Sequence, residues 1–119
     1  MQDPEKAARA IVHILATGDV DAIPSAVAED YVDHQGLGAW RIRRQDGFRR
    51  VVEAVQQQTE VRVTIEDLVA AGDKAAVRLH WEAADDSGRR TTRETLDLLR
   101  FSEGRLVEHW GAEIGRRER

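Results

Sequence analysis

Asp97 and His109 are the residues of this chain whose types and spacing best suit acid–base chemistry. They lie near the end of the chain, in the stretch DLLRFSEGRLVEHW, among apolar side chains. If they share a face of a sheet, the carboxylate can orient the imidazole and hold its proton. An ordinary ion pair on a solvated face, worth roughly a few tenths of a kcal/mol, would have the same spacing. The spacing alone leaves both interpretations open.

The turn of this predicted hairpin decides which side chains face each other. A two-residue turn, Glu103-Gly104, would place Asp97 opposite Trp110, but it needs positive φ at both residues, which glutamate disfavours. A three-residue loop from Ser102 to Gly104 needs only the glycine in the left-handed region. That loop places Asp97 opposite His109, and we expect it.

The three-residue loop also predicts the two faces of the last hairpin. One face would carry Thr95, Asp97, Leu99, Val107, His109, Gly111 and Glu113. The other would carry Leu96, Leu98, Glu108 and Trp110. This second face is too apolar for open water, so we expect a homodimer that packs through it.

The first half of the chain has the pattern of three helices. Asp3, followed by proline, is typical of a helix start, and Gly18 of a helix end. A second, short helix is expected with Asp19 near its start, but Pro24 lies so deep in it that the helix is either broken or starts late. The stretch YVDHQGLGAWRIRR is loop-like, and a third helix begins at about Asp46.

After residue 59 the apolar period changes to two, which predicts strands. The strands cover residues 61–69, 75–81, 91–101 and 105–113. We expect residues 60–113 to form one four-stranded antiparallel sheet that curves around the third helix. Three helices followed by such a sheet make an α+β domain.

Composition restricts the class of protein. The chain has 119 residues, 41% hydrophobic and 34% charged, which is typical of one globular domain over residues 1–119. A net charge of −4 argues against nucleic-acid binding. No apolar run reaches the roughly 20 residues that span a bilayer, and no secretory signal is recognisable, so we expect a cytoplasmic protein without a membrane partner.

The order of these elements, with GDVDAI before EDYVDH and DLLRFSEGRLVEHW near the end, resembles the SnoaL-like polyketide cyclases. These belong to the superfamily of nuclear transport factor 2-like folds, with ketosteroid isomerases and limonene epoxide hydrolases. The resemblance covers nearly the whole chain. It implies a cone-shaped fold, in which three N-terminal helices pack on a curved antiparallel sheet and enclose an apolar cavity.

The resemblance also implies site residues. Asp97 matches a pocket aspartic acid of the isomerases, His109 falls on the pocket side of the last strand, and His34 falls where a polar pocket residue is common. Three positions depart from the family pattern. The isomerase base matches Gln35, and the oxyanion tyrosine matches Ile11. The acid–base carboxylate of the cyclases matches Gly111, so either His109 or Glu113 has taken the role of that carboxylate or the cyclase chemistry is absent.

Three aromatic residues, Tyr31, Trp40 and Phe48, could line a cavity for a flat ligand, although such residues more often form plain core. No nucleotide or phosphate motif occurs, and His34, His80 and His109 lack the spacing of metal ligands, so we expect neither cofactor nor metal. Together with these residues, the resemblance to the SnoaL-like cyclases implies a cofactor-independent cyclase, isomerase or hydratase acting on a small apolar carbonyl compound such as a polyketide. The alternative is a ligand-binding domain without catalysis.

Overall fold

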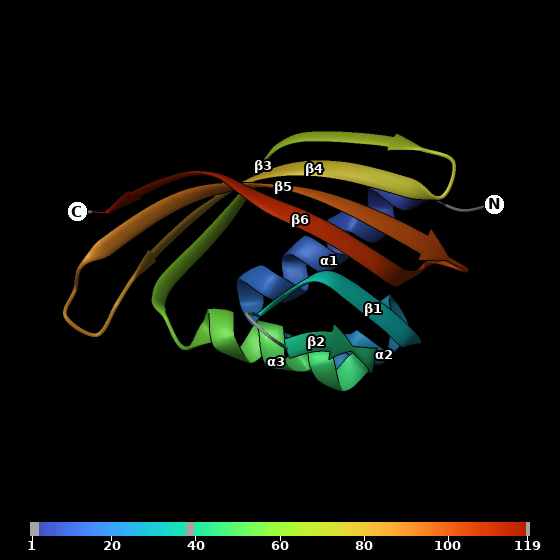
Figure 1. Cartoon of the computed structure of the whole chain (residues 1–119), viewed down its shortest axis with the longest axis horizontal. Helices are drawn as coiled ribbons and strands as arrows, with labels where there is room; N and C mark the ends of the chain where they lie inside the picture. The colour runs from blue at the N-terminus through green and yellow to red at the C-terminus, as the bar shows by residue number, and fades with distance from the viewer. Residues whose placement is uncertain (1–2, 38–39, 119) are drawn as a thin grey trace.

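The computed structural model describes residues 3–37 and 40–118, and the side chains of residues 35–41 and of residue 118 lie outside that description. Figure 1 shows a strongly curved sheet with the helices gathered on one side of it. This is the expected α+β arrangement. Within the described ranges, no helix is both long and apolar enough to cross a membrane.

The helices agree with the sequence pattern. Helix α1 covers Pro4–Thr17: the Asp3 carboxylate accepts a hydrogen bond from the Lys6 N–H at 3.0 Å, and Gly18 ends the helix with φ of 77°. The second helix starts late, which was one of the two outcomes that Pro24 predicted: a 3₁₀ turn at Val20–Ala22 precedes the single-turn α2 at Ile23–Ala26, and Pro24 lies in the first turn of α2. Helix α3 covers Arg44–Gln56, starting two residues before the predicted Asp46.

The loop predicted for YVDHQGLGAWRIRR was wrong, because most of this segment is strand. Strand β1 covers Val27–Leu37 and pairs antiparallel with β2, Trp40–Arg43. Strand β1 also pairs parallel with the last strand of the chain. Glycines and charged residues hide the strand locally, since its main pairing partner lies more than 70 residues away.

The other four strands form the predicted meander: β3 at Thr59–Ala71, β4 at Lys74–Ala84, β5 at Arg90–Ser102 and β6 at Arg105–Glu118. The strand order is β2-β1-β6-β5-β4-β3, so the complete sheet has six strands and is mixed rather than purely antiparallel. The antiparallel strands curve over α1, whereas α3 packs mainly against β1 and β2 (Figure 1). The expectation that the sheet curves around the third helix is corrected accordingly.

The turn between β5 and β6 also differs from the prediction. Ser102 pairs with Arg105, so Glu103 and Gly104 form a two-residue turn, with φ of 52° and 78°. The three-residue loop was wrong. The pairing then shifts by one residue beyond Phe101, through a bulge at Val107 that places two residues of β6 against one of β5.

Beyond the bulge the predicted faces are retained, whereas next to the turn Leu106, rather than the predicted Val107, lies on the cavity side. A shift of one residue moves every side chain to the other face, so the shorter turn and the bulge cancel each other. Asp97 lies opposite Gly111 rather than His109, while Thr95, Asp97 and Leu99 are all buried on the concave side. On the opposite, outer face, Leu96, Leu98 and Trp110 remain exposed by 37–50%.

The core lies between the helices and the concave side of the sheet. Its largest fully buried side chains are Tyr31, Phe101, Ile14, Ile23 and Leu106, which come from α1, α2, β1, β5 and β6. Burial of this apolar surface holds the helices against the strands. The strands that carry the candidate acid–base residues therefore form one wall of this core.

Candidate active site

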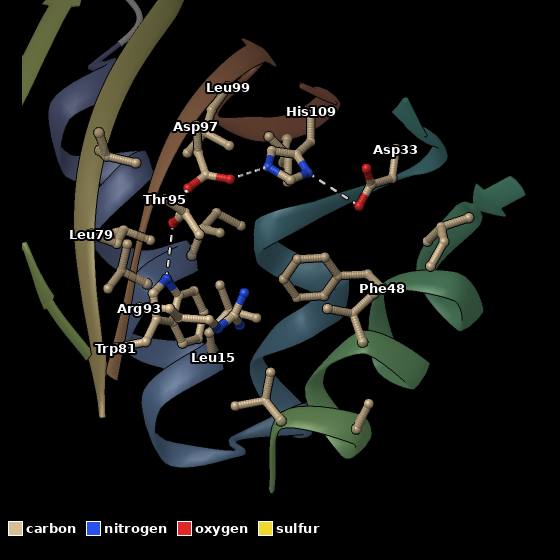
Figure 2. Close-up of a pocket in the computed structure, with 18 of the residues that line it drawn as sticks. Leu15, Asp33, Phe48, Leu79, Trp81, Arg93, Thr95, Asp97, Leu99 and His109 are labelled. Atoms are coloured by element: carbon tan, nitrogen blue, oxygen red, sulfur yellow. Dashed lines mark hydrogen bonds and ion pairs between the residues drawn. The ribbon is translucent and has the colours of Figure 1, made fainter. Parts of the chain in front are cut away.

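A cavity of about 350 Å³ lies between α1, α3 and the concave side of the sheet. Most of its wall is apolar, with Leu15 and Phe48 on the helix side and Leu79 and Leu99 on the sheet side (Figure 2). The lining side chains that carry polar groups are Tyr31, Asp33, Gln58, Trp81, Arg93, Thr95, Asp97, His109 and Arg116. An apolar cavity with few polar groups is the usual form of a small-molecule site.

His109 lies between two carboxylates on this wall. Its Nε2 is 2.6 Å from Asp97 Oδ1, and its Nδ1 is 3.1 Å from Asp33 Oδ2 (Figure 2). The three side chains come from three adjacent strands, since Asp33 of β1 is the direct ladder partner of His109 in β6. Only the parallel pairing of β1 with β6 brings Asp33 to the histidine.

Each carboxylate is held by a further donor. The Thr95 hydroxyl donates to Asp97 Oδ2 at 2.7 Å and accepts from the Trp81 indole N–H at 2.9 Å. The Tyr31 hydroxyl donates to Asp33 Oδ2 at 3.1 Å. These contacts join Trp81, Thr95, Asp97, His109, Asp33 and Tyr31 into one hydrogen-bonded chain across the cavity wall, which we call the carboxylate–histidine chain. Such a fully partnered buried network fixes the positions of its members.

Electrostatics favour the charged form of His109. Burial lowers the pKa of the imidazole, but the hydrogen bonds and negative charges of Asp33 and Asp97 outweigh it and raise the pKa from 6.5 to about 9. Near neutral pH the ring is therefore an imidazolium that donates from both nitrogens. Burial and the neighbouring Asp33 raise the pKa of Tyr31, which keeps its hydroxyl a neutral donor.

The sequence matches a family model. The model of SnoaL-like polyketide cyclases matches residues 5–113. The chain belongs to this family. No curated protein sequence gives a significant match.

Several solved structures share the fold of this chain. IdmH from Streptomyces antibioticus, a candidate polyketide cyclase, is 22% identical with a TM-score of 0.82, over 94% of this chain and 92% of that one. A candidate polyketide cyclase from Bacillus cereus is 23% identical with a TM-score of 0.82, over 96% and 83% of the two chains. An epoxide hydrolase from M. tuberculosis is 18% identical with a TM-score of 0.74, over 91% and 80%. These likenesses establish the nuclear transport factor 2-like fold.

Within this SnoaL-like domain, the predicted acid–base residues divide into two groups. Asp97 and His109 line the cavity together, as expected. His34 does not line it. Its Nε2 bonds Glu108 Oε2 at 2.8 Å, and its ring stacks on Trp110 at 4.8 Å, so it belongs to the outer face. The reason is strand alternation, which turns His34 away from the side that its neighbour Asp33 occupies.

The structure describes the side chains of two of the three predicted aromatic residues, Tyr31 and Phe48. Tyr31 and Phe48 line the cavity, both nearly fully buried, with their rings edge to face at 5.7 Å. The side chain of Trp40, like that of Gln35, lies outside the described part of the chain. Ile11, at the position matched to the oxyanion tyrosine, contributes to the apolar wall.

Sequence reasoning missed Asp33 and Arg93. Asp33 was missed because its segment was interpreted as a loop. In a strand, side chains alternate with a period of two, which would have placed Asp33 on the same face as Tyr31. Arg93 precedes Thr95 and Asp97 on the same face of β5, and that alternation was available in the sequence. Glu113, the alternative acid, instead accepts two hydrogen bonds from Arg116, at 2.8 and 3.2 Å, and does not line the cavity.

Among the described residues, no three histidine, aspartate or glutamate side chains are arranged to hold a metal ion.

Proposed function

We propose that this SnoaL-like protein is a cofactor-independent enzyme of the cyclase or isomerase type. Its substrate is a small apolar carbonyl compound such as a polyketide. The observation that carries the proposal is His109, held between Asp33 and Asp97 on the wall of an otherwise apolar cavity. A proton donor and proton acceptors in contact, shielded from bulk water, are what proton transfer at carbon requires.

The reaction begins with removal of a proton from the carbon next to the carbonyl. Asp97 accepts hydrogen bonds from His109 and from Thr95, so we assign it as the anchor of the imidazolium. We assign Asp33, which lines the cavity on the other side of the imidazole, as the base. Its carboxylate takes the proton, the electrons of the C–H bond pass into an enolate, and the positive charge of His109 stabilises the enolate oxygen.

The second half of the reaction restores Asp33. In an isomerisation, the protonated carboxyl returns its proton to a different carbon. In a cyclisation, the enolate carbon forms a bond to a second carbonyl, whose oxygen takes the proton. The sequence-based hypothesis made His109 the group that moves the proton. The raised pKa of His109 supports instead an imidazolium that stays charged throughout.

Hydrogen exchange on 2-tetralone, a bicyclic apolar ketone, tests this proposal. In deuterium oxide, NMR should show deuterium entering the carbon next to the carbonyl faster with the protein than in buffer alone. Replacing Asp33 by asparagine should slow the catalysed exchange by about a hundredfold or more. His34→Gln is the matched control, because His34 lies on the outer face and should leave the rate unchanged. Exchange at the buffer rate, with the ketone bound, would exclude the proposed chemistry for this ketone class.

The second candidate is a binding domain that kept the cavity and lost the reaction. Ile11 and Gly111, which stand where relatives are expected to carry functional side chains, favour it. Genes for polyketide synthases beside this one would favour the enzyme. The proposal also includes a cytoplasmic location and a homodimer formed through the outer face.

A further inference from the structure

Arg93 reaches the cavity from the same strand and the same side as Thr95 and Asp97. Its guanidinium lies over the ring of Trp81, 4.6 Å from the ring centre (Figure 2). The Trp81 ring is itself fixed, because its N–H donates to Thr95. Arg93 therefore rests on a rigid aromatic surface that is joined to the carboxylate–histidine chain.

The charge of Arg93 is weakly compensated by the protein. Its side chain is 30% exposed, and among the described residues its ion pair is with Glu113, at 4.0 Å. Glu113 is engaged more closely by Arg116, at 2.8 Å. Burial, together with the positive charge of Arg116, lowers the pKa of Arg93 in spite of the nearby carboxylates of Glu113 and Asp97. No hydrogen bond from Arg93 to another described side chain is formed, so its N–H donors remain available to a group in the cavity.

We propose that Arg93 binds an anionic group of the substrate, a carboxylate, and so selects an acidic substrate for this cavity. The inference rests on the proposed function, because it names the substrate class for the same site. A guanidinium presents a planar pair of donors that matches a carboxylate. A neutral ketone would leave this charge without a partner.

The position of Arg93 also restricts the shape of the substrate. Arg93 and Asp97 are four residues apart on an extended strand, so their Cα atoms are separated by about 13 Å. The carboxylate and the reacting carbon therefore lie at different ends of an apolar body, such as a fused ring system, and are not neighbouring groups. A neutral polyketide ester would lack the end that Arg93 recognises.

Calorimetric binding of two matched probes tests the proposal. The probes are 2-naphthoate and 2-naphthamide, which share one ring system and differ in charge. The wild-type protein should bind 2-naphthoate at least about tenfold more tightly than the amide. Arg93→Gln should bind the two probes equally, and Arg93→Lys should keep part of the preference because it keeps the charge. Arg100→Gln is the control, because Arg100 lies on the same strand but bonds Glu108 on the outer face.

Equal affinity of the wild type for the two probes, or a preference that survives in Arg93→Gln, would overturn the inference. So would the absence of binding by either probe. Binding and exchange are separate measurements. A preference for 2-naphthoate without exchange on 2-tetralone would keep the anion site and remove the proposed reaction. Exchange on 2-tetralone without a preference for 2-naphthoate would keep the proposed reaction and remove the anion site.

Discussion

His109 Nε2 lies 2.6 Å from Asp97 Oδ1, although the two residues are not opposite each other in the sheet. Leu99 is the ladder partner of His109, and Gly111 is that of Asp97. The contact therefore runs diagonally across the ladder, a distance that long side chains can bridge. Gly111, the residue opposite Asp97, contributes no side chain of its own at that position.

The contact with Asp97 should control the charge of His109. Replacing Asp97 by asparagine removes a negative charge and an acceptor that hold the proton, so the pKa of His109 should fall from about 9 toward or below 6.5. NMR titration of the imidazole resonances measures this. Glu108→Gln is the matched control, because Glu108 bonds His34 on the outer face and should leave His109 unchanged. An unchanged pKa in Asp97→Asn would contradict the assigned contact.

The stability of the protein should depend on pH through His109. Folding raises the pKa of this group, so its contribution to stability is full below pH 6.5 and is lost as pH rises through about 9. The free energy of unfolding should fall by up to about 3 kcal/mol over this range. Urea unfolding at several pH values measures it. In His109→Gln the free energy of unfolding should change much less with pH. If it falls equally steeply in the wild type and in His109→Gln, groups other than His109 cause the loss.

The pH dependence of the reaction should distinguish the two possible bases. If Asp33 takes the proton beside a charged His109, then kcat/KM should fall as pH rises through about 9, where the imidazolium loses its proton. The exchange assay on 2-tetralone over pH 6 to 10 measures this. A rate that rises through the pKa of His109 would show that the neutral imidazole is the base.

Asp97 and His109 should act as one unit. Asp97→Asn and His109→Gln keep the shapes of the side chains, and each should remove most of the activity. The double variant should be little worse than either single variant, because groups that act together are not independent. Effects on log kcat/KM that simply add would indicate separate roles.

The turn between β5 and β6 offers a test of the hairpin. Glu103 has φ of 52°, which is unfavourable for glutamate and much better tolerated by asparagine. Glu103→Asn should therefore stabilise the protein by about 1 kcal/mol in urea unfolding. Glu103→Gln removes the same charge without relieving the backbone and should bring no such gain. Equal effects of the two changes would point to charge as the cause.

The outer face should hold two copies of the chain together. Leu96 and Leu98 are exposed by 50% and 38% beside Trp110, and a contact of standard size through them should persist at tens of micromolar. Sedimentation should show a dimer that Leu98→Glu dissociates. Ala10→Glu, at an exposed position of α1, should not affect it. A wild-type protein that sediments as a monomer would exclude the interface.

The sequence by itself determined the elements that depend on local pattern. The helix that starts after Asp3, the late start of α2 at Pro24 and the alternating strands from residue 59 are all encoded within a few residues of where they occur. The same alternation placed Asp97 on the buried face and made Leu98 an outer residue. The resemblance to the SnoaL-like family could be recognised for the same reason, because it rests on the order of these locally encoded elements.

The tertiary structure alone decided what depends on distant pairing. Nothing near Asp33 in the sequence indicates that β1 will lie parallel to β6, because that contact joins segments separated by more than 70 residues. The turn at Glu103 likewise overrode a local preference, and the bulge at Val107 restored the faces that a short turn alone would have reversed. His109 became a histidine between two carboxylates because the energy of the whole sheet, rather than any local pattern, fixed the register of its three strands.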